Sequence, residues 1–209
     1  MTPLEIETMA RQRYNAVGDS FWASTEMMGL IWQACQELAR EAKCIRRVFT
    51  TTTVAGTREY AFPTNVTAIK RIIYNGIRLD EVQFTVDDDL TSFYETTTNQ
   101  GPPETFVQWN ETLYLRPIPD GAYTLKIYGY CEPQEVTSTS TLEVPTEYHQ
   151  GLCDYLNMMM AAKDKNLQAA QWFEKRWDLT KAKAVRQERA KYRGGNLISV
   201  YDAEGWLSR

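Results

Sequence analysis

Side chains that could do chemistry are few and scattered in this sequence of 209 residues. Asp87, Asp88 and Asp89 are adjacent, and clustered carboxylates are ligands that Ca²⁺ or Mg²⁺ would accept. The cluster lacks the glycine and the distant glutamate of a calcium loop, so the motif favours a solvated loop. The single histidine, His149, has no nearby serine or cysteine that the sequence identifies as its partner. A hydrolase built on these residues is therefore disfavoured, and we expect no catalytic residues and no enzyme activity.

The cysteines do not form a metal-binding or redox motif. Cys35, Cys44, Cys131 and Cys153 include no CxxC pair, and one histidine leaves few nitrogen ligands for zinc. We expect free thiols, no metal and no cofactor. The N-terminus lacks the apolar core of a signal peptide, and no run approaches the ~20 apolar residues that span a bilayer. These features predict synthesis in a reducing cytoplasm and no membrane contact.

Charge is distributed unevenly along the chain. The net charge is −4 and the pI is about 5.2, which argues against nucleic-acid binding by bulk charge. Residues 78–154 contain three basic and fourteen acidic side chains, whereas residues 163–193 contain ten basic and four acidic ones. This asymmetry predicts separate faces that meet different neighbours.

Helical patterns occupy both ends of the chain. Thr2 and Glu5 predict a capping box at the first helix, and Ser24 is a plausible cap of a second helix. A helix should start near Thr146, and a longer one should run over residues 167–191. The apolar stripe of the second helix, which we interpret as core, comprises Met27, Met28, Ile31, Cys35, Leu38 and Ala42.

The middle of the chain has the two-residue period of β-strands. Residues 101–133 predict two or three antiparallel strands joined by short turns. Asn75-Gly76 lies between apolar runs and predicts a tight hairpin, because both residues tolerate positive φ.

These patterns predict the α+β class, with N- and C-terminal helices packed as a bundle and an inserted antiparallel β-subdomain. The boundaries are 1–45 and 145–193 for the helical body, 46–144 for the β-subdomain and 194–209 for an extended C-terminal tail. The tail is too apolar for ordinary terminal disorder, so we expect it to dock onto a partner. Its candidate contact residues are Leu197, Ile198, Val200, Tyr201, Trp206 and Leu207.

The order of several short motifs resembles that of the head-to-tail adaptor, or connector, proteins of tailed bacteriophages. The fragments, in chain order, are Phe21-Trp22, Gly56-Thr57 with Tyr60-x-Phe62-Pro63, Ile72-x-Tyr74-Asn75-Gly76-x-x-Leu79, Gly101-x-Pro103-x-x-Phe106, Leu113-x-Leu115-x-Pro117-x-Pro119, Leu125-x-Ile127-x-Gly129-Tyr130-x-x-Pro133 and Leu142-x-Val144-Pro145. The resemblance spans roughly residues 21–177.

The resemblance implies a structural virion protein of the neck. It implies a homo-oligomeric ring, usually of twelve subunits, beneath the portal protein and above the tail or a nozzle or stopper protein. The C-terminal tail would reach the portal, with Arg186, Arg189 and Arg193 beside it as interface candidates. Double-stranded DNA would pass through the ring without sequence-specific binding. We expect Asp87 to Asp89 to face the channel or the tail, where like charge keeps DNA from adhering.

A second interpretation is a β-sandwich recognition module with helical arms, which would bind carbohydrate or protein as a receptor-binding or other tail component. The supply of Trp and Tyr in the β-region supports it, since aromatic residues dominate recognition surfaces. Many of these aromatics also fall at alternating positions that a core would use.

Overall fold

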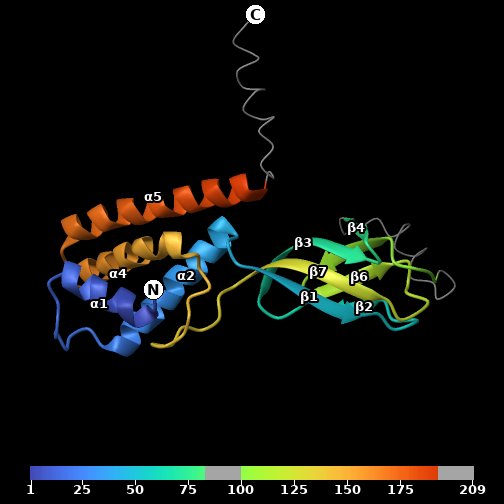
Figure 1. Ribbon diagram of the computed structural model, residues 1–209, viewed down its shortest axis with the longest axis horizontal. Coiled ribbons are helices and arrows are strands. Elements are labelled where there is room, and N and C mark those ends of the chain that lie inside the picture. Colours follow the sequence, from blue (N-terminus) through green and yellow to red (C-terminus); the bar gives the residue numbers. More distant parts are fainter. Residues whose placement is uncertain (83–99, 193–209) are drawn as a thin grey trace, which may run out of the picture. The chain divides into compact units, whose positions relative to one another are not determined.

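A computed structural model describes residues 1–82 and 100–192 of the chain, which divides into two compact units (Figure 1). The helical unit contains Met1–Ile45 and the described residues from Pro133 onward, and the β-unit is Arg46–Glu132. Each unit is described by itself below. The predicted α+β class is confirmed.

Helix α1 spans Pro3–Arg13 and starts with the predicted capping box. The Glu5 backbone N–H donates to the Thr2 hydroxyl at 3.2 Å, and the Thr2 N–H donates to the Glu5 carboxylate at 2.8 Å. These bonds satisfy donors that the first turn of a helix leaves unpaired.

Helix α2 spans Ser24–Ala42 and has no side-chain cap. The prediction that Ser24 caps it is wrong, because its hydroxyl instead donates to the carboxylate of Glu7 at 2.9 Å. Glu7 is only 3% exposed and therefore needs donors within the protein. The apolar stripe is confirmed as core at its central positions, where Ile31 and Leu38 are fully buried.

The C-terminal part begins with a short 3-10 turn, η1 (Thr146–Tyr148), followed by α4 (His149–Lys163) and α5 (Leu167–Tyr192). Helix α4 packs against α1, α2 and α5, and its residues 151–157 are all buried. A Cβ atom at Gly151 would lie 2.3 Å from Cγ2 of Thr180 in α5, so the close approach of these helices requires glycine. The predicted bounds of the long helix are confirmed.

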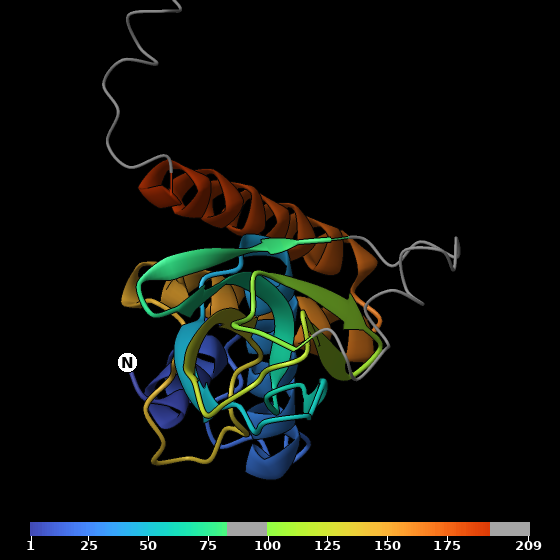
Figure 2. The ribbon, with the colours of Figure 1, turned by 90° about the vertical axis from the view of Figure 1, so that its right-hand side faces the viewer.

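In the described part of the β-unit, seven strands form one mixed sheet in the order β1-β7-β3-β4-β5-β6-β2. The strand bounds are β1 Arg46–Thr52, β2 Glu59–Ala61, β3 Val66–Tyr74, β4 Ile77–Glu81, β5 Thr105–Trp109, β6 Thr112–Arg116 and β7 Thr124–Cys131. The sheet is curled, as Figure 2 shows.

The predicted hairpins are confirmed, whereas the predicted neighbours are partly wrong. Asn75 and Gly76 have φ angles of 45° and 81° and join the paired residues Tyr74 and Ile77. Strands β5 and β6 form the second antiparallel hairpin. Strands β4 and β5 are parallel, however, and β7 pairs with β1 and β3 rather than with β6. These pairings are non-local, so local patterns do not reveal them.

The core of the β-unit is apolar. It consists of Ile72, Leu79, Phe106, Leu113, Leu115, Leu125 and Ile127, with Phe49, Tyr60, Ile69 and Tyr74 packed against it. Leu125 and Ile127 alternate along β7 with exposed or half-buried residues, as the two-residue period predicted.

Candidate interaction surfaces

The described structure includes only part of the predicted site. Asp87, Asp88, Asp89 and Arg193 lie outside the described residues, as do the six tail positions Leu197, Ile198, Val200, Tyr201, Trp206 and Leu207. Arg186 and Arg189 lie on α5, and both are exposed. Their role at an interface stays a prediction.

Helix α5 presents an exposed stripe that mixes apolar and basic side chains. Trp172, Leu179 and Arg186 are spaced by seven residues, which places them on one side of the helix. Trp172 is 54% exposed and Leu179 is 71% exposed. The guanidinium of Arg176 lies 4.8 Å from the centre of the Trp172 ring, a distance at which a cation is attracted to an aromatic face. Large exposed apolar side chains of this kind are typical of contact surfaces.

The opposite side of α5 is fixed to the helical unit. Trp177 is 2% exposed and donates from its indole nitrogen to Glu37 of α2 at 3.3 Å. Lys181 lies 2.6 Å from the same Glu37 carboxylate and 3.2 Å from Asp178. Burial lowers the pKa of Lys181. The hydrogen bonds to Glu37 and Asp178 raise this pKa by more than burial lowers it, so the pKa is above its usual value. The stripe therefore sits on a firmly held helix.

The C-terminal end of α5 is held by a second polar cluster. Tyr148 donates to Glu188 at 3.2 Å, and Lys191 lies 2.8 Å from both Glu188 and Glu147. The hydrogen bond from Lys191 is the main cause that lowers the pKa of Glu147. These contacts position the helix end that precedes the predicted docking tail.

One buried carboxylate connects three helices. Asp154 of α4 is 3% exposed and accepts from Arg176 of α5 at 3.1 Å and from Arg13 of α1 at 3.5 Å. A buried carboxylate is costly unless it is paired, so this pair of arginines favours one relative position of the helices.

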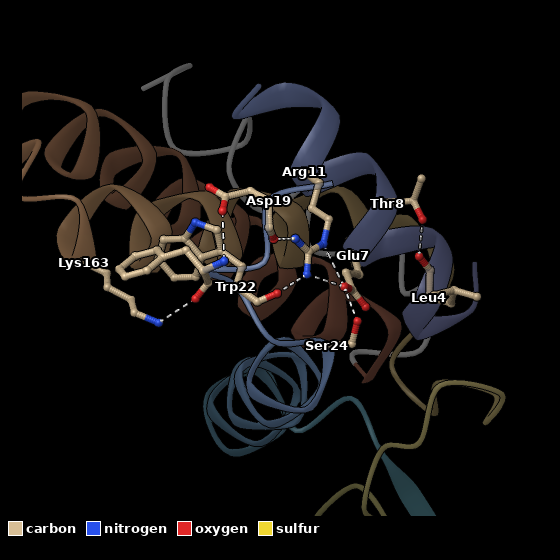
Figure 3. A network of polar contacts seen from close by, with 9 residues as sticks. Leu4, Glu7, Thr8, Arg11, Asp19, Trp22, Ser24 and Lys163 are labelled. Carbon is tan, nitrogen blue, oxygen red and sulfur yellow. Dashed lines mark hydrogen bonds and ion pairs between the residues drawn. The ribbon is translucent and has the colours of Figure 1, made fainter. Parts of the chain in front are cut away.

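The loop between α1 and α2 is anchored by two cations, shown in Figure 3. Arg11 donates to Glu7 at 2.8 Å, to the carbonyl oxygen of Asp19 at 3.1 Å and to that of Trp22. Lys163 lies 2.7 Å from Glu26 and 4.3 Å from the centre of the Trp22 ring. The loop thereby presents a fixed surface.

That surface contains further exposed apolar side chains. Phe21 is 54% exposed and Val17 is 72% exposed, whereas the adjacent Trp22 is 2% exposed. Lys163 lies 4.5 Å from the centre of the Phe21 ring. The local sequence could have indicated this anchor, because Glu7 and Arg11 are spaced by four residues on one helix.

His149 and three of the four cysteines are buried. His149 is 2% exposed, and its Nε2 lies 2.8 Å from the Val144 carbonyl oxygen. Burial lowers the pKa of His149 and raises that of the Cys35 thiol to about 12 and of the Cys153 thiol to about 11. These thiols are protonated at neutral pH and are poor nucleophiles. All four cysteines are free.

The described residues contain neither a metal-binding cluster nor a helix that could span a membrane. Within residues 1–82 and 100–192, no group of three or more His, Cys, Asp or Glu side chains could hold a metal ion. No helix in that part of the chain is long and apolar enough to cross a membrane.

An α+β chain with firmly held helices and exposed apolar-basic surfaces fits the class of structural adaptors, and comparison with known proteins supports this class. A family model described as SU10 adaptor protein matches residues 1–198, so the chain belongs to this family of phage adaptor proteins. The resemblance noted in the sequence is thereby confirmed. Phage adaptors are structural virion components and not an enzyme class. No curated protein matches the chain.

Proposed function

We propose that the protein is a head-to-tail adaptor that forms a ring of twelve copies beneath the portal and joins the capsid to the tail. The observation that carries this proposal is the family match, which extends over residues 1–198 and so includes both units. In the mature virion the ring would occupy the neck, above the tail or a nozzle or stopper protein.

The two units would have separate tasks in this ring. The helical unit would form the body of the ring, and the β-unit would form a separate subdomain. Residues 194–209 would dock onto the portal through their apolar side chains. Arg186 and Arg189 support this assignment, because they are exposed near the end of α5 that leads into this segment.

Double-stranded DNA would pass through the ring without sequence-specific binding. Asp87, Asp88 and Asp89 are proposed to face the channel or the tail, since an acidic wall does not retain phosphate as a basic wall would. A cryo-EM reconstruction of the assembled ring tests this orientation. An acidic segment that pointed to the outer solvent would contradict it.

The mass of the purified protein, alone and with portal particles from the same source, tests the adaptor function. We expect rings on the portal particles. A chain truncated after Gly195 should keep its circular dichroism spectrum but lose attachment to the portal. Two double variants of α5 test whether the proposed interface arginines matter more than other basic residues of the helix. Arg186→Glu with Arg189→Glu should weaken attachment to the portal. The control, Lys175→Glu with Lys183→Glu, makes the same change in net charge and should weaken attachment less.

Two outcomes would contradict the proposal. Portal attachment by the truncated chain would show that the tail is not the docking segment. If the protein does not bind portal particles but binds a glycan or another protein, this result would favour the recognition module. The exposed Trp109 of β5, which is 53% exposed, would then be the first residue to substitute.

A further inference from the structure

The strand register places a set of basic and aromatic side chains on one face of the sheet. Arg46 of β1 is opposite Tyr130 of β7, and Tyr128 of β7 is opposite both Val48 of β1 and Arg71 of β3. Residues directly opposite one another in a sheet point to the same side. The set therefore shares one face of strands β1, β7 and β3.

This face points away from the core of the β-unit. Phe49, Leu125 and Ile127 point to the core, and they alternate with the residues of the set along β1 and β7. Val48 is 55% exposed. We call the outward side the basic sheet face and define it by the exposed cations Arg46, Lys70, Arg71 and Lys126 with the half-buried rings of Tyr128 and Tyr130.

The cations of the basic sheet face lie close enough to influence one another. Burial lowers the pKa of Lys70, and the positive charges of Arg46 and Arg71 lower it further. The Arg71 guanidinium lies 4.3 Å from the centre of the Tyr128 ring, so it rests on an aromatic surface. Neighbouring like charges repel, and an acidic partner would relieve that repulsion.

The β-unit is divided by charge. Strands β1, β3 and β7 contain five basic residues and no acidic one: Arg46, Arg47, Lys70, Arg71 and Lys126. The other described residues of the β-unit contain three basic side chains, Arg58, Arg78 and Arg116. They contain seven acidic ones, Glu59, Asp80, Glu81, Glu104, Glu111, Asp120 and Glu132. The formal charges of the two parts are +5 (5 − 0) and −4 (3 − 7).

We propose that the basic sheet face binds the acidic part of the β-unit in the next copy of this chain. Exposed Asp80 and Glu81 at the end of β4 belong to this acidic part and are the positions chosen to test it. A contact between two different surfaces of identical subunits is heterologous, and such contacts close into rings when the rotation permits. The inference therefore rests on the proposed ring and names the two surfaces through which each subunit would contact its neighbours.

DNA is a less suitable occupant of the same face. Non-specific DNA binding depends on many phosphate contacts and on a protein that attracts polyanions. The chain as a whole carries −4, and the acidic part of the same unit would repel the duplex. A neighbouring copy instead offers a part whose formal charge of −4 is opposite in sign to the four cations of the basic sheet face.

Charge reversal on each surface tests the contact. Arg71→Glu with Lys126→Glu takes the four cations of the basic sheet face from +4 to 0 (4 − 2 − 2), and Asp80→Lys with Glu81→Lys takes the acidic part from −4 to 0 (−4 + 4). Each double variant should raise the concentration needed for ring formation on portal particles at least about tenfold, because the change removes the charge complementarity between the two surfaces. Arg78→Glu is the control, since it adds negative charge to the acidic part, and it should leave that concentration unchanged or lower it.

Mixing the two double variants gives the decisive result. One variant then keeps its acidic part unchanged and the other keeps its basic sheet face unchanged, so every second contact of an alternating ring has the wild-type charges. The equimolar mixture should therefore assemble at a lower concentration than either variant alone. Rings formed equally well by each variant alone would overturn the proposal. Loss of duplex DNA binding by the Arg71→Glu/Lys126→Glu variant, with ring formation intact, would overturn it in favour of DNA.

The controls also separate this inference from the proposed function. A wild-type chain that never forms rings, alone or on portal particles, would contradict the adaptor ring itself and with it this contact. A wild-type chain that forms rings insensitive to both charge reversals would contradict only the contact. Circular dichroism of each variant verifies that the exposed substitutions leave the fold intact.

Discussion

The two units differ in what their interiors contain. Among the described residues, the helical unit buries five polar or charged side chains: Glu7, His149, Asp154, Asn157 and Glu188. The β-unit buries two, Thr53 and Arg116, and otherwise has an apolar core. Buried polar groups need partners with defined geometry, whereas apolar packing needs mainly volume and shape. Both units bury large apolar side chains, so the helical unit should differ from the β-unit in being less tolerant of altered polar pairs.

The largest effect should follow Leu113→Ala in β6. Leu113 is fully buried in the apolar core, and a cavity at such a position costs about 2–5 kcal/mol of unfolding free energy. Amide hydrogen exchange should increase in peptides of the β-unit and change little in the helical unit. Val48→Ala, at a position 55% exposed, is the control and should cost below about 0.5 kcal/mol. Equal loss of protection in both units would show that they unfold together, which would weaken the comparison.

A smaller effect should follow Arg11→Met in α1. This change keeps an unbranched apolar side chain but removes the guanidinium that donates to Glu7 and to the carbonyl oxygens of Asp19 and Trp22. Glu7 is 3% exposed and still accepts from Ser24. We expect a loss of about 2 kcal/mol in the helical unit, measured by urea denaturation, because a buried carboxylate loses its charged partner. Adding Glu7→Leu should recover part of the loss, since replacing both partners by apolar groups can be nearly neutral. A double variant less stable than Arg11→Met would refute this explanation.

The smallest effect concerns pH. Burial lowers the pKa of His149 despite its hydrogen bond to the Val144 carbonyl, so the folded state favours neutral imidazole. Below the unfolded pKa of about 6.5, the unfolded chain binds a proton that the folded chain does not. The stability of the helical unit should therefore fall as the pH drops from 7 towards 5, by at most about 1.4 kcal/mol per pH unit.

His149→Gln isolates this contribution, because the chain has no other histidine. Thermal midpoints of both proteins between pH 5 and 7 should show a shallower slope for the variant. Identical slopes would mean that the imidazole is equally protonated in the folded and unfolded states.

Local signals in the sequence predicted the elements better than their partners. The Thr2 capping box, the Asn75-Gly76 hairpin and the long helix to about Lys191 follow from contacts within a few residues, and all are confirmed. The parallel pairing of β4 with β5 joins strands separated by more than twenty residues of sequence. The position of β7 between β1 and β3 also depends on the core that the whole sheet encloses.

The candidate surfaces were only partly accessible to sequence reasoning. Arg186 and Arg189 were predicted to be available on α5, and they are exposed. The basic sheet face was missed, because its cations come from three strands that are distant in the chain and adjacent only after pairing. The sequence does show that these three strands contain no acidic residue. Only the register shows that the three strands are neighbours and that their cations share one face.

The register of β1 with β7 has a consequence for the history of this chain. Arg46, the first residue of the β-unit, is paired with Tyr130, close to its last residue, Glu132. Paired residues of neighbouring strands lie about 5 Å apart. The chain therefore enters and leaves the β-unit at two positions that are as close as the ends of a tight turn. A gene segment encoding 46–132 could be removed, or exchanged for another, and a few residues would suffice to close the gap. The two ends of the β-unit are thus close together, which is the geometry that favours insertion of one domain into another.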